Sequence, residues 1–165
     1  KHTQECLIPI IDRIKLKKEN FVIIYPNNDY GNEIILNEYL KIKMLKNIRL
    51  LPSMRVEYFL TLLKNSKFVI GNSSCGIMET PIYGVPSINV SNRQKNRYKT
   101  KSIKSFEFPK KKEFYKCIEN FYTNHTRFKI RFNYGSGNSD KNFLKVILNE
   151  NFWKIKNIQK IFNEI

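Results

Sequence analysis

The residues best suited to chemistry lie together in the stretch GNSSCGIMET, residues 71–80, which follows the apolar run KFVI. Small residues let a phosphate group approach the backbone, and serine hydroxyls can donate hydrogen bonds to it. At the start of a helix, unpaired backbone N–H groups also favour an anion. A serine that only caps a helix would give a similar pattern. The residues of the possible phosphate or diphosphate cradle are Gly71, Asn72, Ser73, Ser74 and Gly76.

Two charged residues extend this interpretation to a nucleotide. Glu79 follows Ser74 by about one and a half helical turns, and its carboxylate could accept hydrogen bonds from the two hydroxyls of a ribose. Arg93 follows the next apolar run, SINV, and its guanidinium could pair with phosphate oxygens. Taken alone, Glu79 could be an exposed helix charge and Arg93 a surface arginine. Their combination with Ser73 and Ser74 favours a nucleoside diphosphate site.

A base could lie in the loop that follows the run IRLL, residues 48–51. Met54 in that loop and Phe59 shortly after it could contact a flat ring, while backbone groups hold the polar edge of the ring. Both side chains could equally belong to the core.

The spacing of apolar residues alternates between two periods, which predicts strands and helices in turn. Apolar runs predict strands at 21–25, 48–51, 67–71 and 86–90, and a short strand within 102–108. Helical spacing predicts helices at about 5–18 and 31–45. One more helix is expected after a cap at Ser53, and a short one from about Ser74. The last three helices are expected at about 110–122, 138–148 and 150–163. Pro81 should keep the helix after Ser74 short or bent.

This alternation favours an α/β fold, with a parallel sheet covered by helices on both faces. In such sheets ligands bind outside the carboxyl ends of the strands, which is where the candidate residues are expected.

Length and composition set limits on the class of protein. The 165 residues, 41% of them hydrophobic, suffice for one domain with a core, and the apolar runs are too short to cross a membrane. The three cysteines form no Cys-x-x-Cys pair, and no ligand cluster accompanies them. That pattern favours a cytoplasmic protein without a disulfide framework, metal site or redox cofactor.

The net charge of +16 raises the alternative of a basic nucleic-acid-binding module. Residues 95–131 hold 12 lysines and arginines against 3 acidic residues, a net charge of +9. Such a stretch could contact phosphates, but no nucleic-acid-binding motif accompanies it. A solvated basic face is therefore favoured, and nucleic acid is an unlikely partner.

Several motifs, in order along almost the whole chain, resemble the UDP-N-acetylglucosamine 2-epimerases. They are YPNND-x-G, LPS-x-R-x-EYFLTLLKN, GNSS-x-GI-x-E, YG-x-PSIN, RQ-x-NR and a late YG-x-GN…FW. The resemblance is strongest to the hydrolysing type, which releases UDP and N-acetylmannosamine at the start of sialic-acid synthesis. It implies that residues 1–165 form a single Rossmann-like UDP-binding domain. That domain would be the carboxy-terminal half of an enzyme of the glycosyltransferase-B kind.

The resemblance also implies roles for individual residues. Ser73 and Ser74 would hold the diphosphate, Glu79 the ribose hydroxyls, and Arg93 the phosphates. Uracil would contact Met54 and Phe59. Together with Asn72 and Gly76 of the phosphate cradle, these residues make up the predicted UDP site. No catalytic residue is expected here, because the family's acid–base carboxylates lie in the amino-terminal half.

Other implications concern partners and alternatives. The substrate would be a UDP-sugar, and the full-length enzyme would form a homo-oligomer. A non-hydrolysing epimerase or a sugar-nucleotide transferase would use a similar half. The family's His-Pro-x-Thr motif is incomplete here, since only KHTQE remains at the start. His2 could be the motif's histidine, or that histidine could precede the present chain.

Overall fold

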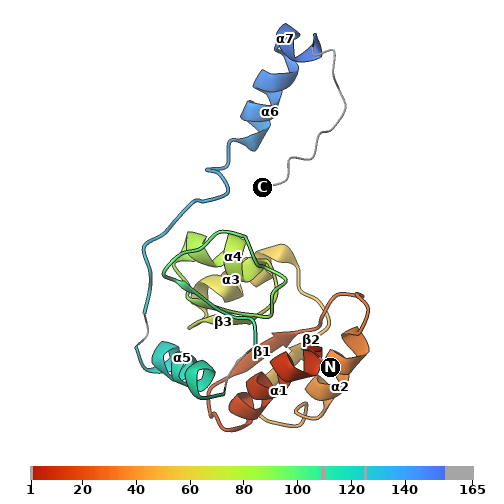
Figure 1. Ribbon diagram of the computed structural model, residues 1–165, viewed down its shortest axis with the longest axis vertical. Helices are drawn as coiled ribbons and strands as arrows, with labels where there is room; N and C mark the ends of the chain where they lie inside the picture. The colour runs from red at the N-terminus through yellow and green to blue at the C-terminus, as the bar shows by residue number, and fades with distance from the viewer. Residues whose placement is uncertain (1, 109–110, 125, 155–165) are drawn as a thin grey trace. The chain divides into compact units, whose positions relative to one another are not determined.

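The computed structural model describes residues 2–108, 111–124 and 126–154. The chain divides into two compact units, one within Lys1–Arg131 and one within Phe132–Ile165, and each is described by itself. The larger unit contains α1 (His2–Lys15), β1 (Phe21–Ile24), α2 (Asn32–Leu40), β2 (Ile48–Leu51), α3 (Val56–Asn65), β3 (Val69–Gly71), α4 (Cys75–Met78), the 3-10 turn η1 (Thr80–Tyr83), β4 (Ser87–Val90), β5 (Ile103–Phe106) and α5 (Lys111–Thr123) (Figure 1).

All strand pairs in the larger unit are parallel, which confirms the expected α/β class. β1 pairs with β2 over Phe21↔Ile48 to Ile24↔Leu51, and β4 lies between β3 and β5. Within the described residues the strands form two ladders, β1-β2 and β3-β4-β5, rather than one.

Side chains connect the two ladders. Tyr122 of α5 packs edge-on against Phe21 of β1, with ring centroids 6.3 Å apart. The same ring packs edge-on against Phe68, next to β3, at 5.1 Å. Aromatic packing of this kind joins the sheets where backbone pairing does not.

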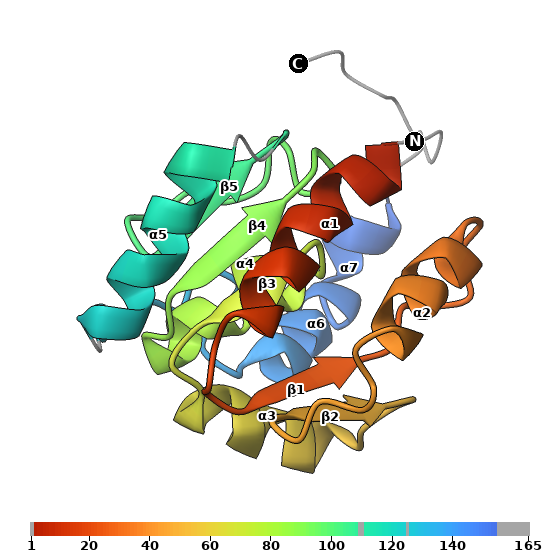
Figure 2. The ribbon, with the colours of Figure 1, turned by 90° about the horizontal axis from the view of Figure 1, so that it is seen from below.

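Helices cover both faces of the three-stranded sheet (Figure 2). On one face, Ile88 and Val90 of β4 pack with Cys6 of α1 and Phe114 of α5. On the other face, Ser87 of β4 contacts α4. β4 is therefore buried on both sides, as its position in the middle of the ladder requires.

A second buried cluster covers the two-stranded sheet. Leu7 and Ile11 of α1 pack with Ile42, which follows α2. Ile23 of β1 and Ile48 of β2 lie against them. The apolar spacing that predicted the first two helices thus corresponds to a real core.

Several helix ends differ from the prediction. The second helix stops at Leu40 rather than near residue 45, since a turn follows it. Ser53 does not cap the third helix, as was expected: α3 begins only at Val56, and its N-cap residue is Arg55, with an extended backbone. The short helix expected before Pro81 is confirmed, because α4 ends at Met78 and continues as a 3-10 turn.

The described part of the smaller unit contains α6 (Ser139–Ile147) and α7 (Glu150–Trp153). Trp153 Nε1 donates a hydrogen bond of 2.7 Å to the carbonyl of Ile147, which folds the second helix back on the first. The predicted helix at 150–163 is observed over α7, and residues 155–163 of that prediction lie outside the described residues.

Gly84 ends the 3-10 turn in a conformation that requires glycine. Its φ is +63°, and its carbonyl accepts a 2.9 Å hydrogen bond from the N–H of Phe128. A Cβ on Gly84 would lie 2.3 Å from the Phe128 carbonyl oxygen, which is backbone and cannot move aside cheaply. This turn therefore fixes where β4 begins relative to α4.

We expect Gly84→Ala to lower the free energy of unfolding by roughly 2–4 kcal/mol, because it combines an unfavourable φ with a steric clash. The matched control is Gly31→Ala. Gly31 also has a positive φ, +84°, but among the described residues no atom lies within 4 Å of its Cβ position. Gly31→Ala should lower the free energy of unfolding by only roughly 1 kcal/mol. Urea unfolding of both variants checks this, and equal losses would contradict it.

Candidate functional site

The pairing of β3 with β4 brings the candidate loops together. Gly71, the last residue of β3, is in register with Asn89, the next-to-last residue of β4. The loops after these strands, 72–74 and 91–97, therefore leave the sheet at one carboxyl edge. Both begin with unusual backbones: φ is +153° at Gly71 and +75° at Ser91, which is not a glycine. Strained turns of this kind are common at functional sites.

Gln94 ties the two loops to each other. Its side-chain Nε2 donates a 2.9 Å hydrogen bond to the carbonyl of Asn72. Only 6% of Gln94 is exposed, so this bond is shielded from water. The sequence analysis did not select Gln94, although the signal was present: it stands beside Arg93 in the loop that follows a predicted strand.

The two serines use their hydroxyls differently. Ser73 Oγ accepts a long hydrogen bond, 3.4 Å, from the N–H of Cys75. Ser74 occupies the N-cap position of α4, but its side chain makes no capping bond to the helix. The simple serine-cap interpretation therefore does not account for Ser74, whose hydroxyl remains available as a donor.

The contribution expected from a helix N-terminus is smaller than the sequence suggested. α4 has only four residues, so its macrodipole is weak. An anion at this edge would have to be held by individual N–H groups, hydroxyls and cations.

The thiol of Cys75 stays neutral in this environment. Burial raises its pKa, and the negative charge of Glu79 raises it further, although a hydrogen bond with Ser73 acts in the opposite direction. A neutral thiol adds no negative charge to a loop that is expected to receive an anion.

Gly76 lies behind the loop rather than at its surface. It is buried, and its carbonyl accepts hydrogen bonds from Thr80 Oγ1 at 2.9 Å and from Ser87 Oγ at 2.5 Å. A Cβ there would be 3.6 Å from Ser87. The structure thus gives Gly76 a packing role between α4 and β4.

Glu79 has an unpaired carboxylate oxygen. Its side chain is half-buried, and Oε2 is shielded from solvent without a hydrogen-bond partner among the described residues. A buried acceptor without a donor is costly, and a ligand hydroxyl could supply that donor. This is the environment that the predicted ribose contact needs.

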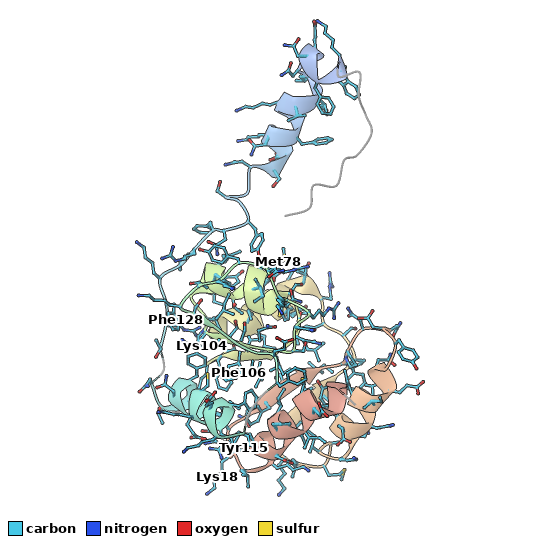
Figure 3. The ribbon with its side chains drawn as sticks, viewed as in Figure 1. Lys18, Met78, Lys104, Phe106, Tyr115 and Phe128 are labelled. Atoms are coloured by element: carbon cyan, nitrogen blue, oxygen red, sulfur yellow. The ribbon has the colours of Figure 1, made fainter. Side chains whose placement is uncertain are left out.

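Arg93 points toward a loop that the sequence analysis had not connected with it. Its Nη1 lies 3.6 Å from Oδ2 of Asp29, which belongs to the loop after β1. The Arg93 and Asp29 side chains are 52% and 68% exposed. Arg97, in the same loop as Arg93, approaches the sulfur of Met78 at 4.0 Å. Met78 itself lies on α4, as Figure 3 shows. Arg93 thus contacts the loop after β1, and Arg97 contacts α4, the helix that follows the two serines.

Met54 and Phe59 are less closely connected to the other candidates. Both are half-buried, and neither is among the residues of the two described core clusters. Within the described part of the chain, no hydrogen bond or ion pair joins their segment to Ser73, Glu79 or Arg93. Their predicted contact with uracil stays a prediction.

Metal-binding clusters and membrane-spanning helices are both absent from the described residues. In residues 2–108, 111–124 and 126–154, no group of three or more His, Cys, Asp or Glu side chains could hold a metal ion. No helix in this part of the chain is long and apolar enough to span a membrane.

Parallel strands with helices on both faces, and polar loops at their carboxyl edge, define a Rossmann-like α/β protein. A solved structure shares this fold with a TM-score of 0.66 at 15% sequence identity, covering 88% of this chain and 40% of the other: the Methanocaldococcus jannaschii UDP-GlcNAc 2-epimerase in complex with UDP-GlcNAc and UDP. The family model of UDP-N-acetylglucosamine 2-epimerase matches residues 1–148. The chain belongs to this family.

Two curated relatives agree with this assignment. The UDP-N-acetylglucosamine 2-epimerase of Neisseria meningitidis serogroup B is 42% identical over 153 residues, which cover 92% of this chain and 40% of the relative. A Campylobacter jejuni enzyme, "GDP/UDP-N,N'-diacetylbacillosamine 2-epimerase (hydrolyzing)", is 33% identical over 106 residues, 62% of this chain and 28% of the relative. The chain thus spans less than half the length of either relative.

The exposed pair Asp29–Arg93 should add little to stability, so that Arg93 is free to take another partner. We expect Asp29→Asn to change the free energy of unfolding by less than about 1 kcal/mol. Glu119→Gln should cost more, because Glu119 of α5 pairs with both Arg13 and Lys17 of the α1 region. Urea unfolding compares the two variants. A large loss for Asp29→Asn would mean that Arg93 is held as part of the structure.

Proposed function

We propose that this chain is the UDP-binding, carboxy-terminal half of a hydrolysing UDP-N-acetylglucosamine 2-epimerase. Membership of the family supports the general activity. The observation that carries the site is the pair of loops tied by Gln94, which places Ser73 and Ser74 beside the arginine loop after β4. The unpaired oxygen of Glu79, shielded in the same region, suits a ribose hydroxyl.

In this proposal the chain binds the leaving group of the reaction. Elimination of UDP from the sugar gives a 2-acetamidoglucal, and addition of water then gives the 2-epimer. Negative charge grows on the diphosphate as the bond to the sugar breaks. Hydroxyl and N–H donors, together with Arg93, would stabilise that charge without having to reorganise as it develops. The acid–base groups for proton removal and hydration would come from the amino-terminal half.

Several other aspects belong to the same proposal. Uracil would lie against Met54 and Phe59, Asn72 would contribute to the phosphate loop, and Gly76 would support that loop from behind. The complete enzyme would be a cytoplasmic homo-oligomer. A non-hydrolysing epimerase or a sugar-nucleotide transferase would use the same UDP site and differ in the product.

We expect the 165-residue chain to bind UDP weakly, and Glu79→Ala to weaken UDP binding roughly ten-fold while changing pyrophosphate binding little. The reason is that Glu79 contacts the ribose, which pyrophosphate lacks. Glu113→Ala, an exposed glutamate of α5, is the control for loss of one negative charge. Calorimetry with both ligands measures the effect. Equal losses for UDP and pyrophosphate would contradict the ribose role, and no UDP binding by folded chain would contradict the site.

The products of the complete enzyme distinguish the proposed reaction from its alternatives. With UDP-N-acetylglucosamine, we expect free N-acetylmannosamine and UDP in equal amounts, and no turnover by the 165-residue chain. Chromatography with mass detection would identify them. UDP-N-acetylmannosamine would show a non-hydrolysing epimerase, a glycoside would show a transferase, and turnover by the chain alone would show that it holds the catalytic base.

A further inference from the structure

The bond between Gln94 and Asn72 fixes more than the distance between two loops. The Asn72 carbonyl can only accept, so the atom that faces it must be the donating nitrogen of the Gln94 amide. The peptide that follows this carbonyl is planar, and in a trans peptide the C=O and the next N–H point in opposite directions. Holding the Asn72 carbonyl toward Gln94 therefore turns the Ser73 N–H away from Gln94.

The Ser73 N–H is a donor in need of an acceptor. Among the described residues neither it nor the Ser74 N–H makes a backbone or side-chain hydrogen bond, whereas the two groups after them are occupied: Cys75 N–H donates to Ser73 Oγ, and Gly76 N–H to the Ser73 carbonyl. Ser73 itself is exposed, so this donor lies at the surface of the carboxyl edge.

Among the described residues, Gln94 supplies the one hydrogen bond to the Asn72 carbonyl that fixes this peptide. Gly71, just before it, has the conformational freedom of glycine, and no described atom lies within 4 Å of its Cβ position. Without Gln94, the peptide between Asn72 and Ser73 could rotate at little cost. The buried amide of Gln94, which belongs to the neighbouring loop, prevents this rotation by holding the Asn72 carbonyl.

We propose that Gln94 is a positioning residue for the diphosphate. It orients the peptide after Asn72 so that the Ser73 N–H faces the phosphates before any ligand arrives. This inference rests on the proposed UDP site, and it assigns the pre-organisation of that site to the Gln94 side chain. A donor that is aimed in advance binds an anion more tightly, because no peptide has to be turned on binding.

A purely structural role would make a different prediction. If Gln94 only joined two loops, its loss would lower stability, and ligand binding would fall only as far as the protein unfolds. Asn47 provides the matched control: its Nδ2 donates to the carbonyls of Lys17 and Glu19, both at 2.9 Å, just before β2. It too is an amide that ties distant backbone segments, but at the opposite ends of the strands.

The test compares Gln94→Met with Asn47→Leu in the full chain, since each keeps side-chain volume and loses the amide. We expect both to lower the melting temperature, but only Gln94→Met to weaken UDP and pyrophosphate, each roughly ten-fold. In 1H–15N spectra, UDP should shift the Ser73 amide proton strongly downfield in the wild type and in Asn47→Leu, but not in Gln94→Met.

Each outcome decides a different point. If the wild type binds no UDP, the proposed function fails and this inference with it. If the wild type binds UDP, and Gln94→Met binds it equally well with the same Ser73 shift, only this inference fails. If Gln94→Met does not fold, Gln94→Glu replaces it, since a carboxylate cannot donate to the Asn72 carbonyl. An unchanged Ser73 amide resonance in the empty Gln94→Glu protein would then overturn the inference.

Discussion

The parallel pairing of β3 with β4 is the constraint on which the candidate site depends. β3 has only three residues, yet its register with β4 decides which loops share the carboxyl edge. α4 supports this pairing from one face of the sheet, because its Gly76 carbonyl receives hydrogen bonds from Ser87 of β4 and from Thr80. Gly84 then lets the chain turn sharply enough to enter β4. A long, stable helix is not needed for this arrangement.

Charge at the edge is balanced rather than uniformly positive. Arg93 lies beside Asp29, Arg97 contacts Met78 on the helix that precedes Glu79, and Cys75 stays neutral because burial raises its pKa. An exposed guanidinium with one acidic neighbour at 3.6 Å can change partners at low cost. The net charge of +16 is therefore a poor guide to the ligand, since individual donors decide what this edge can recognise.

The strands could be predicted from sequence because their apolar runs are continuous and short, as the agreement at 21–24 and 48–51 shows. Helix ends could not, since α3 begins at Val56 without using Ser53, for reasons of local backbone geometry. The candidate residues Ser73 and Ser74 were visible as types in a loop after a strand. Gln94 was visible as a polar residue beside Arg93, but its contact with Asn72, 22 positions away, was not. The contact of Asp29 with Arg93, 64 positions away, was equally hidden.

The exposure of the site residues has a consequence for how the proposed half would work. Ser73 and Arg93 lie at the surface, so a diphosphate held by them would keep one side in water. Hydrogen bonds and ion pairs to phosphate are weak in such a high-dielectric setting and become stronger when water is excluded. Orientation can be set within this chain, as the buried Gln94 bond suggests, but full strength requires a cover from outside it. In the proposed enzyme, this half would supply the fixed donors, and the other half would exclude water when the two halves close on each other. The leaving group would then be bound tightly only at closure, when the catalytic groups are also assembled.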